Sequence, residues 1–338
     1  MTQMWEPVRY VATAPRTTSE LIRQPTHPLF RKAGDRVFQT VVVALGSTIV
    51  LLALLLSVVL LRDGWEPLQR FGFFGFLTGT TWDPVRGVHG TWPFLVGTLI
   101  TSVAALALSF LPAIGVAIFS AEYAPRWLAS IVDTIVDLLA AIPSVVVGIW
   151  GIFVLVPLMQ NQVYLPFYFW AFENWPGILP ILGPPAGYNL ITATIVLALM
   201  IVPYTTALAR DAIRLVPRSQ REAARALGAT RWEVLTLAVL PYARGGIVAG
   251  AILSFGRAIG ETMAVAMLVG NSNTLPFTLF GPAATMPSVI VNEFREAVEN
   301  LHLASLMTVG FYLFLISLVV NLIAAWMQRK FAVGGRAI

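Results

Sequence analysis

Two charged residues lie where charge is costly. The otherwise apolar stretch from Tyr242 to Gly270 contains Arg257 and Glu261. A charge at the centre of a bilayer costs at least about 2.5–3.5 kcal/mol, so each residue must face a cavity or a partner. Their spacing of four places them on one face of a helix. An arginine fork donates two hydrogen bonds to an oxyanion and stays charged at any working pH. The pair therefore indicates either a transport route for such an anion or a self-neutralising pair that fixes helix packing.

On the transport hypothesis, Glu261 holds the Arg257 fork in place and weakens the attraction enough for the anion to leave. Two hydroxyls are candidates for the same route. Thr262 follows Glu261 directly, and Ser144 follows Pro143 inside another apolar segment, where a proline kinks a helix and frees a carbonyl group. Serine is equally common as a hydrogen-bonding residue between packed helices, so both interpretations of Ser144 stay open.

The composition excludes several classes of protein. Of 338 residues, 57% are hydrophobic and 12% charged, which is too little polar surface for a water-soluble body. The chain has no cysteine, and its three histidines, His27, His89 and His302, lie far apart, which disfavours a membrane-embedded enzyme. Neither Lys32 nor Lys330 follows a glycine, so no nucleotide-binding Gly-Lys-Ser/Thr motif is present. Any ATP that drives transport must be bound by another subunit.

Six apolar segments are long enough to cross a bilayer, because about 20 helical residues span its hydrocarbon core. We therefore predict an all-α, polytopic membrane protein with six transmembrane helices. An even number of crossings places both termini on one side. The predicted spans cover residues 37–61, 93–121, 128–159, 189–209, 242–270 and 300–328.

Arginine and lysine gather on the side of the termini, in residues 1–36, in the loop at 210–244 and after the last span. The opposite side carries few of them: Arg62, Arg70, Arg86 and Arg295. By the positive-inside rule, both termini are cytoplasmic. The expected organisation is a cytoplasmic N-terminal extension at 1–36, a transmembrane domain at 37–330 with a cytoplasmic loop at 210–241, and a cytoplasmic tail at 331–338.

The cytoplasmic loop has its own structural signals. Pro217 and Gly228 bound a predicted short helix, and Thr230 with Glu233 forms a capping box that opens a second helix. Four arginines of this loop region at spacings of 4, 3 and 4 form a predicted basic stripe that contacts either anionic lipid headgroups or a groove in a partner protein. The stripe consists of Arg214, Arg218, Arg221 and Arg225.

Two segments on the outer side are less specific. The predicted loop 160–188 is rich in proline and aromatic residues, which fits an interfacial aromatic belt or a docking surface for an extracytoplasmic partner. Residues 271–299 contain Glu293, Glu296 and Glu299 at spacings that predict one solvated helical face.

The cytoplasmic loop also carries an acidic-Ala-Ala, glycine and Leu-Pro pattern, formed by Glu222, Ala223, Ala224, Gly228, Leu240 and Pro241. It resembles the EAA loop of bacterial ABC-importer permeases, EAA-x3-G-x9-I-x-L-P, with Ala238 in place of the isoleucine. In that family the loop is a coupling helix that docks into a cleft of the ATPase subunit. The resemblance implies that this pattern is the ATPase-coupling site.

Three further stretches, 97–102, 142–148 and 256–262, resemble the phosphate-importer permeases, the PstC type more than the PstA type. That family carries an arginine and a glutamate matching Arg257 and Glu261, which implies that both matter for transport. It often has a tyrosine where Val147 stands, so a role for that hydroxyl is not carried over. The resemblance covers roughly residues 37–330.

The resemblance implies the type I ABC-importer permease fold and a multi-pass subunit of the bacterial plasma membrane. Such a subunit forms half of a phosphate pore that works by alternating access. The implied partners are a homologous PstA-like permease, two PstB-like ATPase subunits that bind ATP and Mg²⁺, a PstS-like extracytoplasmic phosphate-binding protein and membrane lipid. No cofactor of its own and no nucleic acid is expected. Alternatives are an importer for another oxyanion, such as sulfate or molybdate, and a stand-alone secondary transporter, for which no internal repeat is evident.

Overall fold

The computed structural model describes residues 28–275 and 278–331. It divides into two compact units that meet between Leu56 and Ser57, so the first helix, α1 (Pro28–Asp63), crosses the boundary. The described ranges contain helices and two isolated β-bridges but no β-strand. The predicted N-terminal extension lies mostly outside the described residues, as does the tail after Phe331.

The prediction of an all-α chain with six membrane helices is confirmed. Within the described ranges, six helical stretches are long and apolar enough to cross a bilayer. They are Gly34–Asp63, Trp92–Tyr123, Ser144–Asn174, Leu190–Arg214, Arg231–Gly260 and Asn300–Met327.

The third stretch differs from the predicted helix at 128–159. Helix α5 (Arg126–Ala141) ends at Ile142 and Pro143, whose backbone is extended, and α6 (Ser144–Trp150) begins after them. Proline disfavours a helical conformation for the residue before it and cannot donate to the preceding turn, which explains the break. The chain then stays helical to Asn174, where a loop was expected. This part comprises η2 (Gly151–Leu155), α7 (Val156–Met159), η3 (Gln160–Tyr164) and α8 (Leu165–Asn174).

The fifth stretch is also divided. Helix α13 (Leu240–Gly260) ends before Glu261, whose backbone is extended with ψ 122°, and α14 (Met263–Leu268) follows. The predicted span at 242–270 is therefore two helices rather than one. The two short helices that follow these breaks, α6 and α14, pack against each other.

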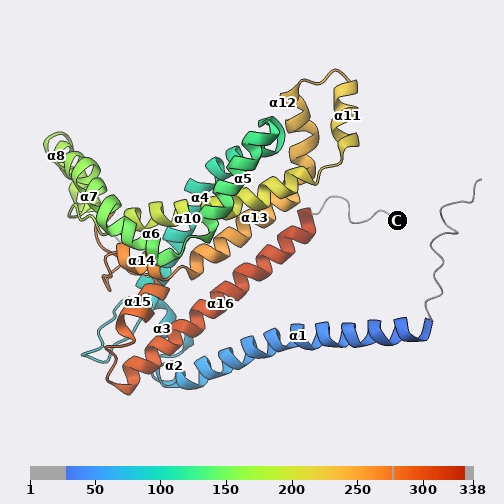
Figure 1. Cartoon of the computed structure of the whole chain (residues 1–338). Coiled ribbons are helices and arrows are strands. Elements are labelled where there is room, and N and C mark those ends of the chain that lie inside the picture. The colour runs from blue at the N-terminus through green and yellow to red at the C-terminus, as the bar shows by residue number, and fades with distance from the viewer. Residues whose placement is uncertain (1–27, 276–277, 332–338) are drawn as a thin grey trace, which may run out of the picture. The chain divides into compact units, whose positions relative to one another are not determined.

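Helix α10 (Leu190–Arg214) is the centre of the second unit (Figure 1). It packs against α4 (Trp92–Ile118), α13 and α5. Small residues allow close approach: a Cβ built on Gly250 would lie 2.8 Å from the Cβ of Leu208. The hydroxyl of Thr205 donates to Ser254 at 2.7 Å across the same contact. Close packing and interhelical hydrogen bonds are the forces that associate helices in lipid.

Short helical elements connect the long helices, and the last helix, α16 (Asn300–Phe331), packs against α13. Figure 1 shows α11 and α12 together at one end of the second unit, away from α7 and α8. The short elements are α2 (Trp65–Phe71), α3 (Phe73–Thr78), η1 (Phe119–Tyr123), η4 (Pro176–Ile178), α9 (Leu179–Leu182), α11 (Arg218–Ala226), α12 (Arg231–Glu233), η5 (Val234–Val239) and α15 (Met286–Glu293).

Glu293 joins several of these segments instead of facing solvent. Its carboxylate accepts hydrogen bonds from Trp82 Nε1 at 2.8 Å and Asn273 Nδ2 at 3.1 Å, and it lies 2.9 Å from His302 Nε2. The prediction of one solvated carboxylate face over Glu293, Glu296 and Glu299 is wrong, because α15 ends at Glu293.

His89 packs against Trp82 and His302, both of which contact Glu293. It makes the stability of the folded protein sensitive to acid. The side chain is 2% exposed, and within the described residues neither ring nitrogen has a hydrogen-bond partner. The imidazole packs edge-on against Trp82 and near-parallel to His302. The pKa of His89 is lowered from 6.5 to about 4, chiefly by burial and also by the charges of His302 and Arg70, whereas Glu293 and Asp83 oppose the change.

We therefore expect the folded protein to lose stability as pH falls from 6.5 towards 4, because the unfolded chain takes up the proton first. Above pH 6.5 the effect is absent. The loss attributable to His89 is on the order of 3 kcal/mol over the whole interval. Thermal unfolding at about pH 7.5 and about pH 5 measures it. The His89→Phe protein should lose less stability than the unmodified protein between those values, and equal losses would contradict the expectation.

Candidate functional site

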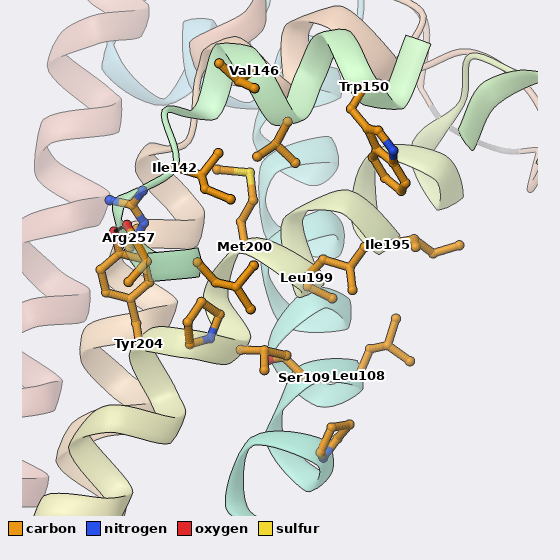
Figure 2. A pocket seen from close by; sticks show the side chains of 17 residues that line it. Leu108, Ser109, Ile142, Val146, Trp150, Ile195, Leu199, Met200, Tyr204 and Arg257 are labelled. Carbon is orange, nitrogen blue, oxygen red and sulfur yellow. Dashed lines mark hydrogen bonds between the residues drawn. The ribbon is translucent and has the colours of Figure 1, made fainter. Parts of the chain in front are cut away.

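Arg257 lies on α13, four residues before Glu261, and its side chain is exposed. Its guanidinium carbon is 4.3 Å from the centre of the Tyr204 ring, which comes from α10. A cation over an aromatic face at this distance is stabilised electrostatically. The Tyr204 hydroxyl donates a hydrogen bond to the carbonyl oxygen of Ala140 at 2.7 Å. This bond holds the Tyr204 ring against the last turn of α5, just before that helix ends. Figure 2 shows Arg257 beside Tyr204.

Arg257 and Glu261 do not form the self-neutralising pair that was one alternative. Within residues 28–275 and 278–331, Arg257 makes no ion pair. The helix ends at Gly260, so the extended backbone of Glu261 turns this side chain towards α14, where it accepts the N–H of Ala264 at 3.5 Å. The expectation that Glu261 holds the guanidinium fork is therefore wrong. The Tyr204 ring supports the guanidinium instead.

Both charged residues nevertheless line one cavity of about 420 Å³. Its polar wall consists of Arg257, Glu261, Tyr204 and Ser254, and its apolar wall includes Leu208 and Leu253. A second cavity of about 720 Å³ lies between α4, α5, α6 and α10 and is almost wholly apolar (Figure 2). Arg257 and Tyr204 line both cavities, so the cation is accessible from two sides.

The two predicted hydroxyl residues lie elsewhere. Among the described residues that line these cavities, neither Ser144 nor Thr262 is present. Ser144 is the partly buried first residue of α6, and the Thr262 hydroxyl donates to the carbonyl oxygen of Gly260 at 3.1 Å. Tyr204 is not among the residues predicted from the sequence, although a tyrosine directly after Pro203 in an apolar span is a signal that could have marked it.

The predicted coupling residues form the helix and turn expected for them. Glu222, Ala223 and Ala224 lie on α11, and Gly228 follows it with φ +87°. The N–H of Ala229 donates to Ala224 at 3.2 Å and that of Gly228 to Arg225 at 2.9 Å. These two bonds form a Schellman motif, which satisfies the last carbonyls of the helix and requires a positive φ at Gly228.

The second helix of this loop begins as predicted. Thr230 Oγ1 accepts the N–H of Glu233 at 3.3 Å, and Glu233 Oε2 accepts the N–H of Thr230 at 2.8 Å, which confirms the capping box. Leu240 and Pro241 open α13. Large apolar side chains are exposed around the loop, beside its charged residues. They are Leu215, Leu227, Trp232 and Leu237.

The predicted basic stripe is only partly a free surface. Arg218 and Arg225 are exposed, as expected. Arg214, however, donates to Asp133 Oδ2 at 2.8 Å and to the Ser120 hydroxyl at 3.1 Å. Arg221 is bonded internally as well, so half of the stripe serves the fold rather than a partner.

Asp133 on α5 forms ion pairs with two arginines near the end of α10, Arg210 and Arg214. Its carboxylate lies 3.1 Å from Arg210 Nη1 and accepts a hydrogen bond from Ser120 at 2.6 Å, in addition to that from Arg214. Burial by itself would raise the pKa of Asp133, but the hydrogen bonds from Ser120, Arg214 and Arg210 outweigh it and lower the pKa. Asp133 is therefore ionised at neutral pH and fixes α5 to α10.

Comparison with known proteins adds independent evidence. Residues 113–333 match the model of a family described as "Binding-protein-dependent transport system inner membrane component". The chain is 40% identical over 297 residues to the "Phosphate transport system permease protein PstC" of Mesorhizobium japonicum, covering 88% of this chain and 90% of that protein. It is 43% identical over 266 residues to the protein of the same name from Pasteurella multocida, covering 77% and 81%.

A solved structure shares the fold. It is the "Crystal structure of bacterial alginate ABC transporter in complex with alginate pentasaccharide-bound periplasmic protein", with a TM-score of 0.58 and 19% identity. The match covers 90% of this chain and 98% of that one. At this identity the likeness concerns the arrangement of helices alone.

Proposed function

Because this chain belongs to the family of binding-protein-dependent transport system inner membrane components, we propose that it is the permease subunit of an ATP-driven importer for inorganic phosphate. It supplies half of a translocation pore. The relatives named as phosphate permeases match it over most of their length, which supports the substrate. The six apolar helices support a multi-pass protein of the bacterial plasma membrane, with both termini in the cytoplasm.

The observation that carries the substrate assignment is the environment of Arg257. Its guanidinium is exposed to two cavities, is supported by an aromatic ring and has no carboxylate partner in the described part of the chain. It is therefore free to donate to two oxygens of a phosphate. Glu261 lines the same cavity and repels the anion, which keeps binding weak enough for release.

Transport proceeds by alternating access, with the energy supplied from outside this chain. Helix α11, with Glu222 and the following turn at Gly228, docks onto an ATPase subunit that binds ATP and Mg²⁺. When two such subunits close, α11 moves with them and the pore opens outward to a phosphate-binding protein; hydrolysis returns it to the inward state. A second, homologous permease forms the other half of the pore.

Uptake of radiolabelled phosphate tests the proposal. The complete operon is expressed in a strain that lacks its own high-affinity phosphate system. We expect uptake that unlabelled phosphate suppresses and that sulfate and molybdate do not. Rescue of sulfate or molybdate uptake instead would favour the importer for another oxyanion. Phosphate transport by the purified chain alone in liposomes would overturn the ATP-driven mechanism in favour of a secondary transporter.

A further inference from the structure

Arg221 differs from its neighbours on α11. The arginines before and after it, Arg218 and Arg225, are exposed, whereas the side chain of Arg221 is 15% exposed. A buried arginine on a short, otherwise exposed cytoplasmic helix requires specific partners, because an unpaired charge would be strongly destabilising there.

The guanidinium has partners on two other elements. Nη2 and Nε donate to Glu122 Oε1 at 2.7 Å and 3.1 Å, and Glu122 belongs to η1, which continues α4. Nη2 also donates to the carbonyl oxygen of Ile213 at 2.8 Å, and Nη1 donates to that of Val216. Ile213 and Val216 lie in and directly after the last turn of α10. One side chain therefore joins α11 to the ends of two membrane helices.

Each contact suits a guanidinium in particular. The last carbonyls of an α-helix have no partner within the helix, and the partial negative charge there attracts a cation. Glu122 is 16% exposed, so its carboxylate depends on Arg221 for charge compensation. A lysine has a single nitrogen and cannot reach a carboxylate and two carbonyls in this planar arrangement.

Besides the contacts of Arg221, α11 has two other connections to the rest of the chain. Packing joins α11 to η5, which leads into α13. A three-residue linker, 215–217, joins α11 to α10. The Arg221–Glu122 pair extends these connections to η1 and hence to α4.

We propose that Arg221 is a positioning residue that transmits the movement of α11 to the ends of α4 and α10. The source of that movement, a partner ATPase, rests on the function proposed above. Without Arg221, α11 still docks, but its displacement is partly absorbed by rotation about the linker at 215–217. ATP hydrolysis then continues while gating fails.

The first test needs neither substrate nor partner. Because the chain has no cysteine, Ser219→Cys on α11 and Ser130→Cys on α5 provide two unique sites for spin labels; both serines are exposed. In the full-length protein in lipid nanodiscs, we expect Arg221→Ala to broaden the distribution of distances between the labels. The matched control Arg218→Ala should leave it unchanged. An unchanged width in the Arg221→Ala protein would overturn the proposal.

The second test measures coupling in the assembled complex. For Arg221→Ala we expect phosphate uptake per ATP hydrolysed to fall about tenfold or more, while hydrolysis per complex stays within about twofold. Arg221→Lys and Glu122→Gln, which keep part of the interaction, should show smaller losses in the same direction, and Arg218→Ala none. Equal losses of uptake and hydrolysis would overturn the proposal. If the unmodified complex takes up no phosphate, the proposed function fails, whereas the label distances still test Arg221.

Discussion

Arg257→Gln is expected to reduce phosphate uptake by about 100-fold or more, while the protein assembles normally. A hydrogen bond to a charged group contributes about 1.5–3 kcal/mol, and glutamine loses the charge and the two-pronged donor together. Folding should be preserved, because Arg257 makes no ion pair among the described residues and a neutral side chain is less costly at this depth. Initial rates of radiolabelled phosphate uptake, normalised to the amount of assembled complex, measure the effect.

The matched control is Arg244→Gln, an exposed arginine earlier on the same helix. This substitution removes the same charge from α13, but Arg244 lines neither cavity. We expect its uptake to stay near that of the unmodified protein. Should Arg257→Gln transport phosphate at the same rate as this control, the guanidinium would be a packing element over Tyr204 and not a substrate contact.

Gly228→Val is expected to weaken retention of the ATPase about tenfold. The φ of +87° is strained for any residue with a Cβ, and most strained for a β-branched one, at about 1–2 kcal/mol. A Cβ at this position would meet no atom within 4 Å, so the effect arises from the backbone alone. Relief of the strain breaks the Schellman bonds to Ala224 and Arg225 and displaces the docking end of α11.

Co-purification of the ATPase with the tagged permease measures that effect. Gly228→Asn is the matched control, because asparagine tolerates a left-handed backbone far better than valine does. It should retain most of the ATPase. Recovery of the ATPase with Gly228→Val at the level of the unmodified protein would show that the shape of this turn does not determine docking.

The features predicted correctly from the sequence are local ones. The length of an uncharged stretch is enough to indicate a membrane helix, and the capping box at Thr230 and the turn at Gly228 follow from residues within a few positions. The span boundaries were harder, because the stretch from Leu138 to Phe172 is uncharged throughout, so no charged residue marks where one helix ends and the next begins.

The features that were missed depend on residues distant in the chain. Tyr204 meets Arg257 because α10 packs against α13. Arg221 on α11 meets Glu122 on η1, although the two residues are 99 positions apart in the chain. Spacing placed Arg257 and Glu261 on one helical face, but the break after Gly260 separated them. A spacing of four residues places two side chains on the same face only within an unbroken helix. A single residue with extended backbone between them is enough to separate the two side chains.

The breaks at Pro143 and Glu261 have a mechanical consequence. A helix moves as one body while its backbone hydrogen bonds are continuous, and both segments lose that continuity close to Arg257. We expect α5 and α13 to turn without dragging α6 and α14, which pack on each other. On this expectation, α6 and α14 keep their positions while α5 and α13 rotate relative to them.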